Sequence, residues 1–144
     1  MKTDESSNTS NPFRDREPLE DSLAVKCLIE GEIDVLGRMP WSSNATFLVD
    51  ISLDEKIIQG VYKPLSGERP LHDFPPEIYK REVAAWELAK QLNWGMIPPT
   101  VSRLGPLGEG SLQLYVPCDY EQHYFTLRDK ASYSKTLKKL AVFD

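Results

Sequence analysis

The stretch QGVYKPLSGERPL, residues 59–71, carries the end of an apolar strand into the approach to a long helix, and the predicted fold is built around it. Successive side chains of a strand point to opposite faces, so Ile57, Val61 and Lys63 share one face and Tyr62 lies on the other. If the face of Ile57 and Val61 is the buried one, Lys63 points inward with no partner nearby in the sequence. A lysine in that position needs a partner from another element.

The composition is that of an ordinary globular protein. The 144 residues are 40% hydrophobic and 27% charged, which suits one domain rather than two. A net charge of −5 argues against a nucleic acid or an anionic membrane as partner. No apolar run reaches the length of a membrane span, and the N-terminus is polar rather than signal-like. We therefore expect a cytoplasmic protein.

Two segments differ in composition. Residues 1–21 are rich in serine, asparagine and charge and have few large apolar side chains, so we predict a disordered tail. Residues 22–144 carry the apolar patterns of a folded unit.

An antiparallel meander followed by a helix is predicted in the middle of the chain. Three alternating segments read as strands joined by short connections: EIDVLGRM (32–39), NATFLVDISL (44–53) and KIIQGVYKP (56–64). The run PPEIYKREVAAWELAKQLNWG, residues 75–95, predicts a long helix with prolines in its first turn. Glu77 suits the positive end of this helix, and Gly95 is the expected left-handed stop.

The rest of the chain completes the predicted sheet. Residues 100–117, TVSRLGPLGEGSLQLYVP, indicate two strands around a Gly/Pro turn. Residues 132–144, SYSKTLKKLAVFD, have helical spacing, and residues 22–31 fit either a helix or a strand. The predicted class is α+β, with a five-stranded antiparallel sheet, one long helix packed on it and a C-terminal helix.

A carboxylate interrupts the apolar face of the long helix. Glu82 falls on a stripe that runs from Ile78 to Leu92, and a buried carboxylate is costly unless it is paired. We therefore predict that Glu82 holds Lys63. In kinase-type sites a strand lysine contacts nucleotide phosphates and a helix glutamate orients it. A purely structural ion pair is the alternative, and the pattern leaves the two open.

The connection between the first two strands adds a candidate phosphate loop. Gly37 and the small polar residues Ser42, Ser43 and Asn44 would let backbone N–H groups approach a phosphate. A polar hairpin loop without a ligand explains the same residues equally well.

The end of the fifth predicted strand is a candidate adenine site. There the backbone groups of Tyr115 and Val116 would meet the edge of the base. Cys27 and Cys118 show no metal-ligand spacing, and a single disulfide between them stays open. No metal site is predicted, and a small hydrolase is disfavoured because neither a GxSxG elbow nor an HExxH helix is present.

Several of these runs together resemble a known family. The segments SNATFLV, VYKPLSGERPLHDFP, REVAAWELAKQLNW, PPTVSRLGPLGEGSLQLYVP and KKLAVFD are similar to bacterial proteins of unknown physiological role. That family is related to the catalytic domain of phosphatidylinositol 3- and 4-kinases and, more distantly, to HipA-type serine kinases. The resemblance covers the chain from about residue 30 onward and implies a kinase-like small lobe. It implies that Lys63 contacts the phosphates of ATP, that Glu82 is its partner, and that the loop of Ser42 to Asn44 lies over them.

The resemblance also implies a missing part. In the family, a segment ending like AVFD leads into the catalytic loop and later to a metal-binding aspartate, and neither follows within these 144 residues. We therefore predict no catalytic residue and no metal ligand here, and we expect Mg²⁺ only with a large catalytic lobe. The expected function is an ATP-binding lobe that is inactive alone. The alternative is a non-catalytic interaction module, with a structural Lys63–Glu82 pair and an exposed face for a partner protein.

Overall fold

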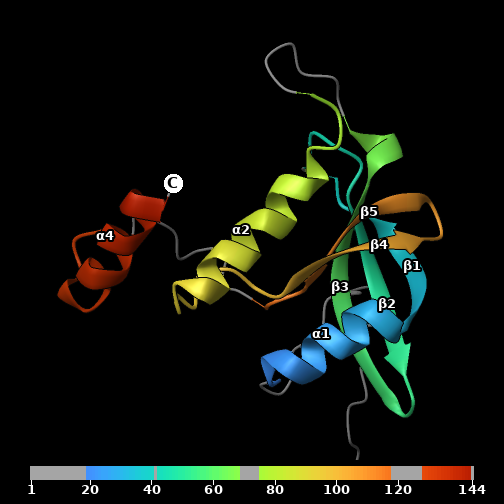
Figure 1. The fold of residues 1–144 in the computed structure, drawn as a ribbon, viewed down its shortest axis with the longest axis horizontal. Coiled ribbons are helices and arrows are strands. Elements are labelled where there is room, and N and C mark those ends of the chain that lie inside the picture. Colours follow the sequence, from blue (N-terminus) through green and yellow to red (C-terminus); the bar gives the residue numbers. More distant parts are fainter. Residues whose placement is uncertain (1–18, 41, 69–74, 118–127, 144) are drawn as a thin grey trace, which may run out of the picture.

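The computed structural model describes residues 19–40, 42–68, 75–117 and 128–143. Within these ranges the chain forms a five-stranded antiparallel sheet in the order β1-β2-β3-β5-β4, together with three α-helices (Figure 1). The strands are β1 (Glu32–Arg38), β2 (Phe47–Leu53), β3 (Lys56–Pro64), β4 (Thr100–Gly105) and β5 (Gly108–Leu114). The helices are α1 (Asp21–Glu30), α2 (Tyr79–Gln91) and α4 (Ser134–Phe143), with short 3₁₀ turns η1 (Leu65–Gly67) and η2 (Ala131–Tyr133). The predicted α+β class, antiparallel sheet and C-terminal helix are confirmed.

The first three strands form the predicted meander. Leu53 pairs with Lys56 across a two-residue turn in which Asp54 has a φ of 53°. A left-handed residue in such a turn matches the twist of the strands that it joins. β1 pairs with β2 through a register shift between Val35 and Gly37. Gly37 therefore lies within a strand, not in the loop that follows it.

The two helices α1 and α2 cover opposite faces of the sheet. Ile58 and Tyr62 of β3 belong to the apolar core that contains Cys27 and Leu28 of α1. Lys63 points to the other face, where it meets α2. The apolar core thus lies on the α1 side of the sheet, and the α2 side is more polar. Buried polar residues on that second face are Gln59, Thr100 and Ser111.

The expected inward face of β3 is only partly right. Ile57 is 60% exposed, and the buried apolar side chains of the strand are Ile58, Tyr62 and Pro64. α2 packs on β4 and β5, and its Glu82 reaches the far end of β3 at Lys63. The start of β3 lies beyond that contact, which leaves Ile57 exposed.

The sheet-facing stripe of α2 is rotated from the predicted one. Its buried residues are Tyr79, Trp86 and Ala89. Leu92, expected on the stripe, is 45% exposed. The helix begins after the two prolines, and Asn93, with a φ of 54°, supplies the left-handed residue beyond its end in place of Gly95.

The segment of residues 22–31, which fitted either a helix or a strand, forms α1 up to Glu30, and Gly31 caps the helix. Its C-terminal end is tied to β4 by Arg103, whose Nη1 donates to the carbonyl oxygens of Leu28 at 2.8 Å and Gly31 at 2.7 Å. A cation suits the negative end of a helix. Asp21, the last residue of the predicted tail, already belongs to the helix, and residues 1–18 lie outside the described ranges.

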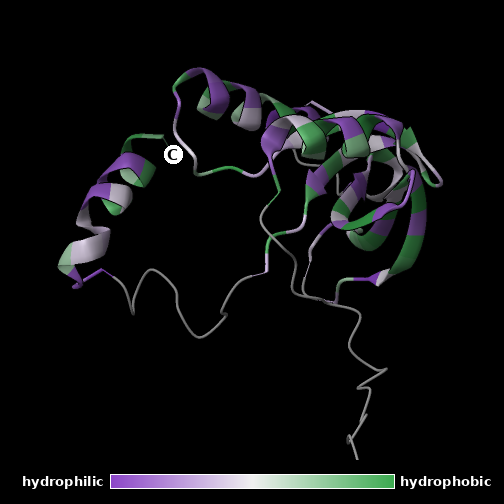
Figure 2. Cartoon of the chain, turned by 90° about the horizontal axis from the view of Figure 1, so that it is seen from below, coloured by the Kyte–Doolittle hydropathy of each residue, from purple (hydrophilic) through white to green (hydrophobic). Residues whose placement is uncertain are grey.

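α4 stands apart from the sheet in two perpendicular views (Figures 1 and 2). It has no buried residue, and hydrophilic and hydrophobic residues alternate along it (Figure 2). The rings of Trp94 and Phe143 lie 6.2 Å apart, which brings the end of α4 to the segment after α2. None of the helices in the described ranges is both long and apolar enough to cross a membrane.

Candidate functional site

β3 and α2 bring Lys63 and Glu82 together, as predicted. Lys63 Nζ donates to Glu82 Oε1 at 2.6 Å. About a third of each side chain is exposed, 32% for Lys63 and 33% for Glu82. The pair is therefore ordered by the fold and still accessible to a ligand that arrives from solvent.

The ion pair contributes little to the stability of the fold. Pairs with this exposure contribute about 0–1 kcal/mol, because water screens the charges and ordering both side chains costs entropy. A typical domain has an unfolding free energy of about 5–15 kcal/mol. Removal of either charge should therefore leave the domain folded, and the site can be tested by substitution.

β5 passes unusually close to the backbone of β3 beside Lys63. A Cβ atom at Gly110 would lie 2.2 Å from the carbonyl oxygen of Lys63 and 2.6 Å from Cα of Pro64, so only glycine fits there. Lys63 itself pairs with Ser111 across the two strands. The Ser111 hydroxyl is buried and makes no hydrogen bond to another described residue.

The predicted phosphate loop lies at the same end of the sheet as Lys63. Residues 39–46 connect β1 to β2, and Phe47 at the start of β2 pairs with Tyr62 beside Lys63. The backbone N–H of Ala45 donates to the Gly67 carbonyl at 3.0 Å, which ties the loop to the turn that follows β3. The topology therefore brings the β1–β2 loop and Lys63 to the same end of the strands.

The side chains of this loop are partly used within it. Ser42 Oγ lies 2.6 Å from Thr46 Oγ1, and Thr46 Oγ1 donates to the Asn44 carbonyl at 3.3 Å. Ser43 is exposed. The loop thus presents an exposed hydroxyl and backbone groups rather than a set of hydroxyls aimed at Lys63.

Tyr115 and Val116 directly follow the end of β5, and Tyr115 is still hydrogen-bonded to β3. Tyr115 is 8% exposed, and its N–H donates to the Gln59 carbonyl at 3.0 Å, so this donor belongs to the sheet. Gln59 stands four residues before Lys63, or about 13 Å along a strand. The next residue, Val116, is 43% exposed, so its side chain reaches solvent while that of Tyr115 is buried. An adenine edge at this position would meet the backbone of Val116 rather than the N–H of Tyr115.

Sequence reasoning missed Glu68. Its carboxylate accepts hydrogen bonds from the backbone N–H groups of Glu77, Ile78 and Tyr79 at 3.1, 3.0 and 2.7 Å. It takes the role expected of Glu77, which instead has a φ of 71° and pairs with Lys80 at 2.7 Å. In the usual capping pattern, the side chain and the N–H group that it binds are three residues apart in the sequence. Glu68 stands 11 residues before Tyr79, the first residue of α2, so no such local pattern reveals it.

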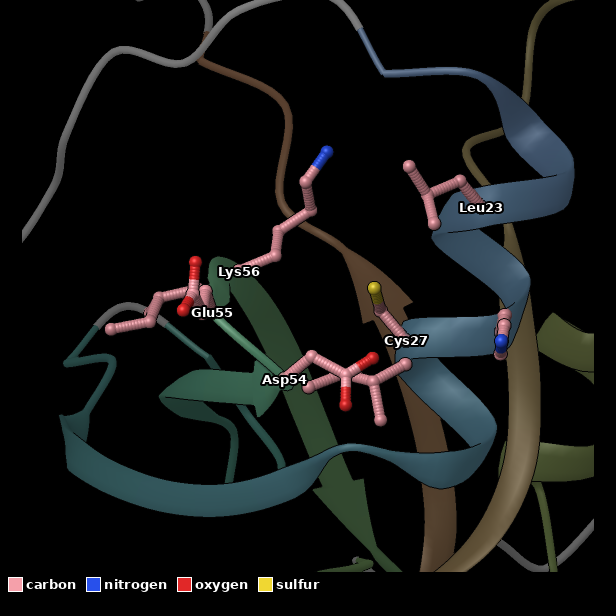
Figure 3. A pocket seen from close by; sticks show the side chains of 8 residues that line it. Leu23, Cys27, Asp54, Glu55 and Lys56 are labelled. Carbon is pink, nitrogen blue, oxygen red and sulfur yellow. The ribbon is translucent and has the colours of Figure 1, made fainter.

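A separate concavity of about 560 Å³ lies between α1 and the β2–β3 hairpin (Figure 3). Leu23 and the buried, free thiol of Cys27 line it from α1, and Asp54 and Lys56 line it from the hairpin. Lys56 is seven residues before Lys63, which places this concavity about 23 Å from the ion pair along β3. It is not part of the Lys63 site.

Neither a disulfide nor a metal site emerges from the described residues. Cys118, the other half of the open disulfide, lies outside them. Among the described residues no three histidine, cysteine, aspartate or glutamate side chains converge in the manner of a metal site.

The chain is similar to Protein Rv2133c of Mycobacterium tuberculosis (strain ATCC 25618 / H37Rv). The two are 49% identical over 90 residues, which cover 62% of this chain and 32% of the relative. The matched part thus spans about a third of that relative's length. No family model matches the chain, and no solved structure matches it. The kinase relationship stays a prediction.

Proposed function

We propose that this chain is the nucleotide-binding small lobe of a kinase-like phosphotransferase, with ATP as the ligand. The observation that carries the proposal is the 2.6 Å contact between Lys63 on a central strand and Glu82 in the first turn of the adjacent helix, with both side chains one-third exposed. The same arrangement orients the phosphate-contacting lysine in kinase-type sites.

Each part of the candidate site has a separate role in this proposal. The Lys63 ammonium would neutralise phosphate charge, and Glu82 would hold the ammonium in place through their hydrogen bond. The backbone of residues 42–44 would close over the phosphates, and the Val116 backbone would meet the adenine edge. Phosphoryl transfer also needs an aspartate for the acceptor hydroxyl and ligands for Mg²⁺, which we assign to a second, catalytic lobe. We further propose that the protein acts in the cytoplasm.

The proposal is tested by titrating ATP into the whole chain and into two lysine variants. Lys63→Met removes the charge at the site, and Lys56→Met removes an exposed charge at the other end of the same strand. A ligand present at one hundred times its Kd stabilises the folded state by about 2.7 kcal/mol, which a thermal midpoint detects. We expect this shift in the wild type and in Lys56→Met, and its loss in Lys63→Met.

Because the metal ligands are assigned elsewhere, Mg²⁺ should change the affinity of this chain little. An equal shift in all three proteins would place the nucleotide away from Lys63 and contradict the proposed site. The absence of any shift in the wild type would contradict nucleotide binding by this chain.

A second candidate is a non-catalytic interaction module, in which Lys63 and Glu82 form a structural pair. Exposed apolar side chains at the C-terminal end of α2 favour it: Leu88 of the helix and Leu92, the residue directly after it, are 49% and 45% exposed and stand one helical turn apart. A partner protein that covered both leucines would remove this apolar surface from water. This candidate predicts no ATP shift, together with self-association in sedimentation experiments that Leu88→Ser and Leu92→Ser abolish.

A further inference from the structure

Glu68 links the sheet to the first turn of α2. Its carboxylate accepts three consecutive backbone N–H groups, from residues 77, 78 and 79, at 3.1, 3.0 and 2.7 Å. The residue before the helix, Ile78, makes no side-chain cap of its own. The first N–H groups of a helix have no partner within the helix, so Glu68 supplies the acceptors that this end needs.

Glu68 is itself held on the sheet side. It follows η1 directly, and its own N–H donates to the Leu65 carbonyl at 3.1 Å. η1 is anchored to the β1–β2 loop by the hydrogen bond between Ala45 and Gly67, and to the β4–β5 turn by Ser66 Oγ, which donates to the Leu107 carbonyl at 3.3 Å. These hydrogen bonds fix the backbone of Glu68 relative to the sheet, and therefore limit where its carboxylate can lie.

The same two elements are joined a second time at Lys63. Glu82 lies in the first turn of α2, three residues after Tyr79, and Lys63 lies five residues before Glu68. β3 is thus connected to the start of α2 in two ways. Along the chain, β3 continues into η1 and Glu68, whose carboxylate binds the first N–H groups of α2. Across space, Glu82 in the first turn of α2 binds Lys63 of β3. If the first turn of α2 frays, Glu82 moves with it.

We propose that Glu68 is the positioning residue of the Lys63 site, because its carboxylate docks the start of α2 onto β3 and thereby presents Glu82 to Lys63. This inference deepens the proposed nucleotide site and rests on it for its consequence in ligand binding. The positioning itself is measurable without any ligand.

The test compares Glu68→Gln and Glu68→Ala with a matched control, Glu77→Gln. The control removes an acid in the same neighbourhood whose carboxylate pairs with Lys80 and not with helix N–H groups. Glu68→Gln keeps one acceptor oxygen and should fold, whereas Glu68→Ala removes all of them. Amide hydrogen exchange at residues 77–82 should accelerate about tenfold in Glu68→Ala, less in Glu68→Gln, and not in the control.

The second readout is the rate at which an amine reagent modifies each lysine, resolved by mass spectrometry. Loss of Glu82 as a partner should expose the Lys63 amine, so Glu82→Gln and Glu68→Ala should both raise the Lys63 rate several-fold relative to Lys56. The two effects should not add in the double variant, because both act through one contact. A general loss of stability would instead raise the rates of all lysines together.

An unchanged Lys63 rate in Glu68→Ala, beside an increased rate in Glu82→Gln, would overturn the positioning role. ATP binding by the same variants separates this inference from the proposed function. Weaker ATP binding in Glu68→Ala, with the Lys63 rate increased, supports both. An increased Lys63 rate in a protein whose wild type binds no ATP supports the positioning role and contradicts the nucleotide site.

Discussion

The contact between β5 and the backbone of Lys63 makes Gly110→Ala a sensitive probe of the site. The new Cβ would stand 2.2 Å from the Lys63 carbonyl oxygen, 2.8 Å from its carbonyl carbon and 2.6 Å from Cα of Pro64. The shortest of these is about 1 Å closer than a normal non-bonded contact. All three neighbours are backbone atoms, so no side chain can rotate away, and the two central strands must separate instead.

Overpacking of a well-packed interior costs about 1–3 kcal/mol, and a clash against backbone belongs at the upper end of that range. A loss of about 3 kcal/mol should lower the Tm of a domain of this size by roughly 10 °C. Gly37→Ala is the matched control, because Gly37 is also a strand glycine but a Cβ there meets nothing within 4 Å. Thermal unfolding followed by circular dichroism measures both variants. A Gly110→Ala midpoint close to that of Gly37→Ala would refute the close approach of the two strands.

Two further predictions concern the α1 side of the sheet. Arg103→Met removes the guanidinium that binds two carbonyl oxygens at the end of α1. Hydrogen bonds from charged groups contribute about 1.5–3 kcal/mol each, and Arg103 is half-buried, so we expect a loss at the low end of the sum, about 3 kcal/mol, in urea unfolding. A loss below about 0.5 kcal/mol would show that α1 is held without it. Burial raises the pKa of Tyr62, whose hydroxyl donates to the Gly108 carbonyl. The stability that this provides is complete below the unfolded-state pKa of about 10 and is lost as the pH rises through the higher folded-state pKa, since the unfolded chain releases its proton first. The urea midpoint should therefore fall above about pH 10, and should fall less in Tyr62→Phe; equal falls in the two proteins would contradict the buried hydroxyl.

Local patterns predicted the sheet well because each element carries its own signal. The three strands of the meander alternate with period two, and the turn at Asp54 is short and polar, so pairing between neighbours follows directly. Lys63 and Glu82 were predicted as partners because Lys63 stands on the expected inward face of its strand and Glu82 on the apolar stripe of the helix that packs against the sheet. The pairing is then observed at 2.6 Å.

Helix ends and faces were predicted less well, since they depend on what lies against them. Leu92 continues the apolar spacing of α2 but extends past the sheet and is 45% exposed. Both Asn93 and Gly95 tolerate a left-handed backbone, and only the observed end of the helix selects Asn93.

The α+β class, the meander and the long helix follow from the sequence alone, because each depends on the periodicity of its own segment. The meeting of Lys63 and Glu82, 19 residues apart, follows from where each charge stands within its own element. The folded structure was needed to show that α1 covers the face of the sheet opposite α2 and that β5 lies between β3 and β4. It also shows that Glu68 caps α2, and that β5 lies so close to the backbone of Lys63 at Gly110 that a side chain would not fit there. These features depend on contacts between residues distant in sequence, where register and close packing, rather than any local pattern, select the partner.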